Sequence, residues 1–202
     1  MSNKLDLIKI LNTILQYLNS GLDLQNSIIK TIKVLKLNKK QQEFVNKEIL
    51  NDGINSLVNL IGQVINQEMN KNKPKNFPNF RVNEKIKFFV LHRLRIIDKF
   101  FDKKIIFSLI FKQRSLVQLN KMLFNICDEI WFLSGDTSTD FNYYSKRFIL
   151  MNVYTFSFMY FLKDNSDDFS KTEIFIDKQI KSVLTFGKLK SKISGFFYSN
   201  KI

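Results

Sequence analysis

The chain has 202 residues, 45% of them hydrophobic, and a formal net charge of +14 from 32 basic and 18 acidic side chains. This hydrophobic content excludes a globally disordered chain and is enough for one domain with a buried core. The basic excess favours contact with nucleic acid or an anionic membrane surface. The absence of alanine, with only five arginines, is also the pattern that an A/T-rich genome produces.

Helical periodicity dominates the N-terminal part, where no stretch alternates as a strand does. The residues Asn19-Ser-Gly21 end the first helix. Both prolines fall in the segment 70–78, so helix is not expected to continue through it. We therefore predict an N-terminal subdomain over residues 1–70 and a linker over 71–82. The further helices expected in the subdomain are 24–35, 39–48 and 52–69.

Short helices followed by a longer one are typical of tetracycline-repressor-type regulators, in which the second and third helices enter the DNA major groove. Lys39, Lys40, Gln41 and Gln42 are placed to contact DNA in such an arrangement. The joint at 34–38 lacks the usual turn glycine, however. We favour a helix-turn-helix-like subdomain without a DNA-reading role and keep the regulator as the alternative.

The C-terminal part also has helical spacing throughout. Asn83 is expected to cap a helix, Gly135 to close one and Gly187 to close another. The longest apolar run, 148–162, is shorter than the roughly 20 residues that span a bilayer. We predict a helical domain over 83–187 with helices at 103–112, 115–133, 140–162 and from 168–170 to 187.

The tail, residues 188–202, has apolar residues on one helical face and lysines beside them. This pattern predicts an amphipathic helix at a membrane interface. A final helix packed on its own domain or on a second copy is the alternative. The residues expected to engage the membrane are Lys188, Leu189, Lys190, Lys192, Ile193, Phe196 and Phe197.

Polar and aromatic residues gather between two apolar helices, in the segment 135–147. Thr137, Ser138, Thr139 and Asp140 are good helix caps and are enough to start a helix. They do not account for Tyr143 and Tyr144 in the first helical turn, followed by Arg147. Exposed tyrosines beside an arginine are typical of protein recognition surfaces.

This segment resembles a known family. The residues that carry the resemblance are Asp128-Glu-Ile-Trp131, Gly135-Asp136, Ser138-Thr-Asp-Phe-Asn142, Tyr144, Lys146-Arg147, Tyr154 and Asp164-x-Ser-x-Asp-Phe169. They match, in order and spacing, the ubiquinone-biosynthesis accessory protein family of the coenzyme Q complex. The resemblance extends from the first helix to Leu184 and is strongest over 128–177.

The resemblance implies a function and partners. The family is an all-α, tetracycline-repressor-like homodimer that has lost DNA binding, holds isoprenoid lipid in an apolar cavity and assists the di-iron demethoxyubiquinone hydroxylase. This implies a polyprenyl quinone ligand and the hydroxylase as partner. It also implies a peripheral position on the inner membrane: the cytoplasmic side in a bacterium, the matrix side in a mitochondrion. A membrane-surface protein without a cavity is a further alternative.

The resemblance also implies site residues. The family's docking patch maps onto Asp140, Tyr143, Tyr144 and Arg147, although the family typically has tryptophan where this chain has Tyr143. The spacing i, i+3, i+4, i+7 places these four on one helix face, which we expect to be exposed. Individual cavity residues do not carry over from the family. The candidate lining residues are Phe107, Leu109, Phe111, Met122, Ile126, Phe156 and Met159, and ordinary core packing is the alternative for each.

No arrangement of residues in the sequence suggests catalysis. Asp128 and Glu129 are adjacent on a helix and point in different directions, so they do not form a carboxylate pair. His92 and Cys127 are the only residues of their types, which argues against a metal site and an internal disulfide. We therefore expect a binding protein without cofactor or metal rather than an enzyme.

Overall fold

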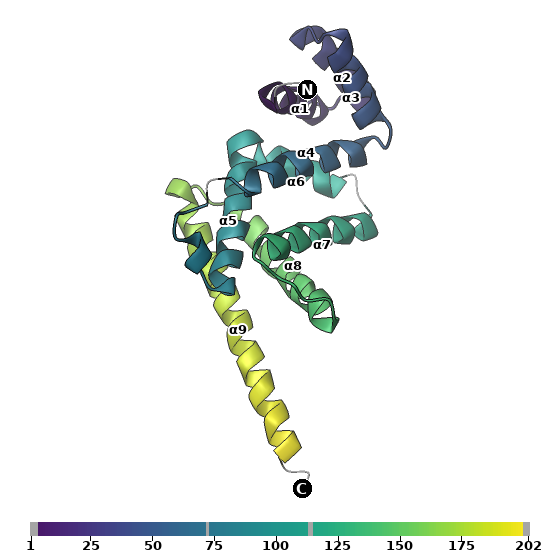
Figure 1. Ribbon diagram of the computed structural model, residues 1–202. Helices are drawn as coiled ribbons and strands as arrows, with labels where there is room; N and C mark the ends of the chain where they lie inside the picture. The colour runs from purple at the N-terminus through teal and green to yellow at the C-terminus, as the bar shows by residue number, and fades with distance from the viewer. Residues whose placement is uncertain (1–3, 72, 113–114, 200–202) are drawn as a thin grey trace. The chain divides into compact units, whose positions relative to one another are not determined.

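The computed structural model describes residues 4–71, 73–112 and 115–199, with side chains for 6–71, 73–110 and 115–185. All regular structure in these residues is helical, which confirms the predicted all-α class. The α-helices are α1 (Lys4–Asn19), α2 (Leu24–Leu35), α3 (Lys39–Leu50), α4 (Ile54–Met69), α5 (Val82–Phe100), α6 (Lys103–Lys112), α7 (Leu116–Leu133), α8 (Phe141–Phe161) and α9 (Ser170–Ser199), with short 3-10 helices η1 (Phe77–Asn79) and η2 (Asp167–Phe169) (Figure 1). The tetracycline-repressor-like arrangement stays a prediction.

The chain folds as two compact units. The first comprises residues 1–72 and 96–119, and the second comprises 73–95 and 120–202. The first break, after residue 72, falls in the predicted linker. Helical periodicity could not show that residues 96–119 fold with the N-terminal helices, because the spacing of apolar residues says which face is buried but not against which segment.

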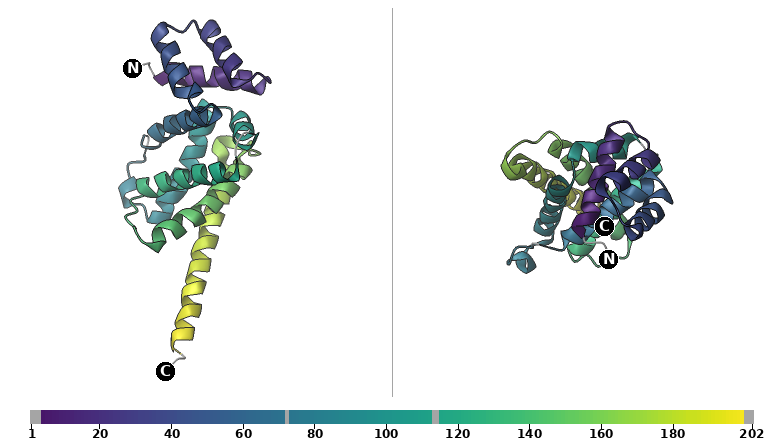
Figure 2. Two further views of the ribbon diagram at one scale, coloured as in Figure 1. Left: turned by 90° about the vertical axis from the view of Figure 1, so that its right-hand side faces the viewer. Right: turned by 90° about the horizontal axis from the view of Figure 1, so that it is seen from above.

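In the first unit, α1 packs against α2, and α3 packs against α4 (Figure 2). The Asp23 side chain caps α2, and Asn38 and Gln41 form a reciprocal capping box at the start of α3. Lys36 adopts the left-handed conformation, with φ 49°, at the turn between α2 and α3 where the sequence has no glycine. The core of this unit includes Leu11, Ile14, Val45, Ile49 and Leu57.

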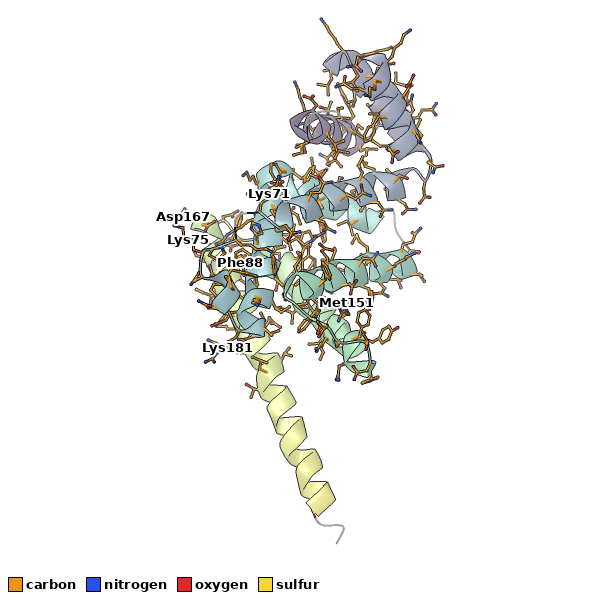
Figure 3. The ribbon with its side chains drawn as sticks, in the orientation of Figure 1. Lys71, Lys75, Phe88, Met151, Asp167 and Lys181 are labelled. Atoms are coloured by element: carbon orange, nitrogen blue, oxygen red, sulfur yellow. The ribbon has the colours of Figure 1, made fainter. Side chains whose placement is uncertain are left out.

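In the second unit, α8 packs against α9 (Figure 1). Its fully buried side chains include Phe89 of α5, Ile130 of α7, Phe161 of α8 and Ile176 of α9. Met151 lies on α8, and Phe88 lies on α5 (Figure 3). Lys87 on α5 forms ion pairs of 3.3 and 3.8 Å with Glu173 and Asp177 on α9, which fix the two helices side by side.

A strained turn precedes α9. Asp168 and Phe169 are consecutive non-glycine residues in the left-handed region, with φ 49° and 57°, a conformation that costs about 1–2 kcal/mol for a residue with a Cβ. The Nη2 atom of Arg95 donates to both the backbone oxygen and the carboxylate of Asp168, at 3.1 and 2.7 Å. The Phe169 ring packs on Phe161, with centroids 4.7 Å apart. These contacts hold the turn.

Two predicted helix boundaries are wrong. Helix α9 does not end at Gly187 but continues to Ser199, because one glycine costs only about 1 kcal/mol in a helix that other residues favour. Helix α5 begins at Val82 rather than after Asn83, and Glu84 accepts the backbone N–H of Arg81 at its start. In the described part of the chain, no helix combines the length and apolarity needed to cross a bilayer.

Candidate functional site

A cluster of charged side chains joins α7, the loop 134–140 and α8. Arg147 is at its centre and only 3% of its side chain is exposed. Its Nε donates to Asp128 at 2.9 Å, and its Nη1 donates to Asp136 at 2.7 Å and to the backbone oxygen of Tyr143 at 3.2 Å. The prediction that Arg147 is exposed is therefore wrong. We call Asp128, Asp136, Ser138, Tyr143, Lys146 and Arg147 the Arg147 cluster.

Asp136 anchors the loop to α8. One carboxylate oxygen accepts from Lys146 Nζ at 2.7 Å, and the other accepts from Arg147 and, at 2.8 Å, from the Ser138 hydroxyl. Burial alone would raise the pKa of Asp136, but the hydrogen bonds from Lys146, Arg147 and Ser138 outweigh it and hold that pKa below its usual range. The loop conformation thus depends on an ionised Asp136.

Tyr143 belongs to the same cluster rather than to an exposed surface. Its hydroxyl donates to Asp128 at 2.8 Å, and this hydrogen bond raises the pKa of Tyr143. The guanidinium carbon of Arg147 lies 3.6 Å from the centroid of the Tyr143 ring. The ring therefore covers Arg147, which revises the expectation that Tyr143 is free to contact a partner. On α7, Trp131 donates its indole N–H to the Lys146 backbone oxygen at 3.2 Å.

The exposed surface of the first turns of α8 is apolar. Phe141, Tyr144 and Phe148 are 82%, 63% and 66% exposed, and their spacing of i, i+3, i+7 places them on one helix face. We call these three residues the α8 strip. Asp140 is also exposed, and it caps α8 by accepting the backbone N–H of Asn142 at 3.0 Å. Of the four predicted docking residues, Asp140 and Tyr144 therefore remain at the surface.

Two of the residues predicted to line a lipid cavity are exposed. Phe156 and Met159 are exposed on α8, so the expectation that they line a closed cavity is wrong for this chain as described. Phe107 belongs to the first unit, Met122 and Ile126 are half-buried in the second, and Leu109 is buried in the first. The side chain of Phe111 lies outside the described residues.

The first unit contains an open pocket of about 570 Å³ beside α1 and the α5–α6 turn. Its lining is rich in charge, including Asp98, Lys99 and Lys103, and the ammonium of Lys103 lies 3.9 Å from Asp98. This pocket does not have the apolar character of an isoprenoid site. None of the predicted lipid-lining residues contributes to it.

The predicted membrane-binding residues fall in the last turns of α9. Their backbone is helical through Ser199, but the side chains of Lys188, Leu189, Lys190, Lys192, Ile193, Phe196 and Phe197 lie outside the described ones. The structure adds to the membrane-binding prediction that the backbone of the tail continues α9 as one helix through Ser199.

No group of three or more histidine, cysteine, aspartate and glutamate side chains suited to a metal ion occurs in the described residues. Cys127 is fully buried on α7, and burial raises the pKa of its thiol to about 12, against the smaller opposite effect of Arg93 and Arg147. A thiol with this pKa is almost entirely protonated at neutral pH and is a poor nucleophile.

Residues 116–187, from the start of α7 into α9, match the family model described as COQ9. This region is COQ9-like. The match contains the whole Arg147 cluster and the whole α8 strip, and it confirms the resemblance found in the sequence. The matched region is shorter than the resemblance suggested, because the helices α1–α4 lie outside it.

Several COQ9 proteins are similar to the chain. The probable ubiquinone biosynthesis protein coq9, mitochondrial, of Dictyostelium discoideum is 32% identical over 111 residues, which are 54% of this chain and 36% of that protein. The COQ9 proteins of Xenopus tropicalis and Rattus norvegicus are 34% and 32% identical over 74 and 72 residues, each 23% of the relative. The matched part thus spans about a quarter to a third of these COQ9 relatives.

Proposed function

We propose that this protein is an accessory protein of ubiquinone biosynthesis that binds a polyprenyl quinone intermediate and presents it to the demethoxyubiquinone hydroxylase at the membrane. The observation that carries the proposal is the COQ9 match over residues 116–187. It coincides with the segment in which a buried ion cluster supports an exposed apolar strip. The mitochondrial names of the relatives favour the matrix side of the mitochondrial inner membrane.

The α8 strip is the surface that we assign to the hydroxylase. Phe141, Tyr144 and Phe148 expose large rings side by side, and aromatic anchors of this kind supply most of the binding energy in protein interfaces. Asp140 adds a charge at the end of the strip. The Arg147 cluster does not contact the partner in this arrangement, because its central groups are buried; it holds the strip in place.

Tyr144→Ala is expected to weaken binding to the hydroxylase by about 1–3 kcal/mol, as truncation of an interface aromatic does, with little change in melting temperature. Titration of the purified hydroxylase measures the affinity, and thermal unfolding measures stability. Phe44→Ala is the control, because Phe44 is also an exposed aromatic residue but lies on α3 in the first unit. Equal losses for the two variants would contradict the assignment of the strip.

A lipid ligand requires apolar surface that closes around it, since burial contributes roughly 25 cal/mol per Å². We expect purified protein to carry isoprenoid quinone lipid when it is extracted and analysed by mass spectrometry. Protein unfolded and refolded without lipid is the control. Repeated preparations free of isoprenoid and acyl lipid would remove the basis of the lipid-binding part of the proposal.

The proposal includes a homodimer. Phe148, Ile149, Phe156, Met159 and Tyr160 are all exposed along α8, a larger apolar face than a lone soluble helix usually presents. A second copy would cover the part of this face beyond the α8 strip. Light scattering is expected to show twice the mass of the chain at micromolar concentrations, and a monomer across that range would contradict the dimer.

The DNA-binding alternative is less well supported by the first unit. Helix α3, which would be the reading helix, exposes Glu43 and Glu48. Carboxylates on a groove-facing helix repel the phosphate backbone. The proposed role is therefore that of a binding protein rather than a regulator or an enzyme.

A further inference from the structure

The turn between α2 and α3 in the first unit presents a surface rich in lysine. We call Lys30, Lys33, Lys36, Lys39 and Lys40 the lysine face. All five are exposed, and residues 24–42 contain no aspartate or glutamate. Codon bias raises the number of lysines along a whole chain, but it does not remove acidic residues from one surface.

Ion pairs do not account for the lysine face. Within the part of the chain whose side chains are described, none of its five ammonium groups pairs with a carboxylate. Lys39 and Lys40 stand in the first turn of α3, which has no acidic residue. Cations there oppose the helix dipole and reduce helix stability. Lys39 and Lys40 therefore raise the local positive potential at a cost to helix stability, whereas Lys33 lies in the last turn of α2, where a cation is favourable.

Apolar side chains interrupt the lysine face. Val34 is 62% exposed and Ile29 is also exposed, and both lie on the outward side of α2 beside Lys30 and Lys33. The ammonium of Lys30 lies 5.6 Å from the ring centroid of Tyr17, which is half-buried on α1. Exposed aliphatic side chains among lysines, with a nearby tyrosine, are typical of protein surfaces that enter the headgroup region of a bilayer.

We propose that the lysine face binds an anionic lipid bilayer, with the ammonium groups at the level of the lipid phosphates and with Val34 and Ile29 in contact with the acyl boundary. Nucleic acid fits less well, because the lysine face has no arginine to bind phosphate with two hydrogen bonds and carries exposed Val34 and Ile29. This inference does not depend on quinone binding or on the tail.

A fluorophore attached at position 34 tests directly whether the lysine face inserts into the bilayer. In the full chain, Val34→Cys can be labelled selectively, because the native Cys127 is buried and its thiol pKa is about 12. We expect the emission of a polarity-sensitive label to shift to the blue with vesicles of phosphatidylcholine containing about one third phosphatidylserine, but not with phosphatidylcholine alone. Val82→Cys, exposed on α5, is the control and should show no shift.

The charge requirement is tested by a matched pair of variants. Lys33→Gln/Lys40→Gln should bind the anionic vesicles about thirtyfold more weakly, since each of the two lysines near such a surface contributes roughly a fivefold factor in affinity. Lys47→Gln/Lys178→Gln removes the same charge from exposed positions elsewhere and should bind like the unaltered chain. Circular dichroism checks that both pairs are folded.

Two results would overturn the inference. One is equal vesicle binding by both pairs of variants, together with the same emission shift at positions 34 and 82. The other is a loss for Lys33→Gln/Lys40→Gln in binding to a DNA duplex but not to vesicles, which would assign the lysine face to nucleic acid. Neither result bears on the outcome of the lipid extraction, which tests the proposed function separately.

Discussion

Arg147→Ala is expected to lower the free energy of unfolding by about 3–5 kcal/mol, the usual cost of breaking a buried ion pair by removing one partner. Only 3% of the Arg147 side chain and 4% of the Asp136 side chain are exposed. The substitution leaves Asp136 with Lys146 as its remaining cation and takes a donor from Asp128. Urea unfolding followed by fluorescence of Trp131, the only tryptophan and a neighbour of Lys146, measures the loss.

Arg81→Ala is the matched control for this substitution, because Arg81 is exposed at the start of α5, and its effect should stay within about 0.5 kcal/mol. The double variant Arg147→Ala/Asp136→Ala should lose less than the sum of the two single variants, because the two side chains act as a pair. A strictly additive double variant would show that they are independent and that the cluster does not hold the loop.

Asp164→Ala is expected to destabilise the protein by about 2–4 kcal/mol, the sum of a lost helix cap and an unsatisfied buried donor. One oxygen of Asp164 accepts from the backbone N–H and hydroxyl of Ser166 at 2.8 and 2.6 Å, and the other accepts the same two groups of Thr172 at 2.8 and 2.6 Å. Thr172 is fully buried in the first turn of α9.

The neighbouring Asp167→Ala controls for the loss of one negative charge, since Asp167 is exposed in η2 (Figure 3). It should leave the midpoint of urea unfolding nearly unchanged. Asp164→Asn should fall between the two, because an amide oxygen can still accept from Thr172 while the amide nitrogen cannot replace the second acceptor. Indistinguishable midpoints for Asp164→Ala and Asp167→Ala would contradict the role assigned to Asp164.

Helix positions could be predicted from the sequence. The spacing of apolar residues and the punctuation by glycine, proline and capping residues indicated α2, α6, α7 and α8 to within about one or two residues. The helix end predicted at Gly187 was wrong because a single glycine was taken as a stop signal without regard to the helix-forming residues on both sides of it. Lys36 shows the reverse case, in which a non-glycine residue takes the left-handed position of a turn.

The orientation of α8 could not be predicted. The spacing of positions 140, 143, 144 and 147 correctly places them near one another on the helix, but α8 has apolar residues on almost every side. Periodicity therefore does not say which face is inward. The partners of Arg147 are Asp128, 19 residues earlier, and Asp136, 11 residues earlier, and only the packing of α7 on α8 brings them together.

The sequence prediction missed further residues for the same reason, because periodicity does not show which face of a helix is inward. No role was predicted for Phe141 or Phe148, yet both are exposed in the first turns of α8. Asp128 was predicted only not to pair with Glu129, yet it accepts from Tyr143 and Arg147. An acidic residue within an otherwise apolar helix was the one available signal that a cation or a hydroxyl donor packs beside it.

The length of α9 has a mechanical consequence. A continuous helix of 30 residues is about 45 Å long, and its first turn is attached to the rest of the second unit through Asp164, Arg95 and the left-handed pair Asp168 and Phe169. Helix α9 is also held over its next turns by the buried Ile176 and by the ion pairs of Lys87 with Glu173 and Asp177. Rotation of this anchored segment as one body by about ten degrees displaces the far end by about 8 Å, so a small shift of α9 on α8 becomes a large sweep of its basic end.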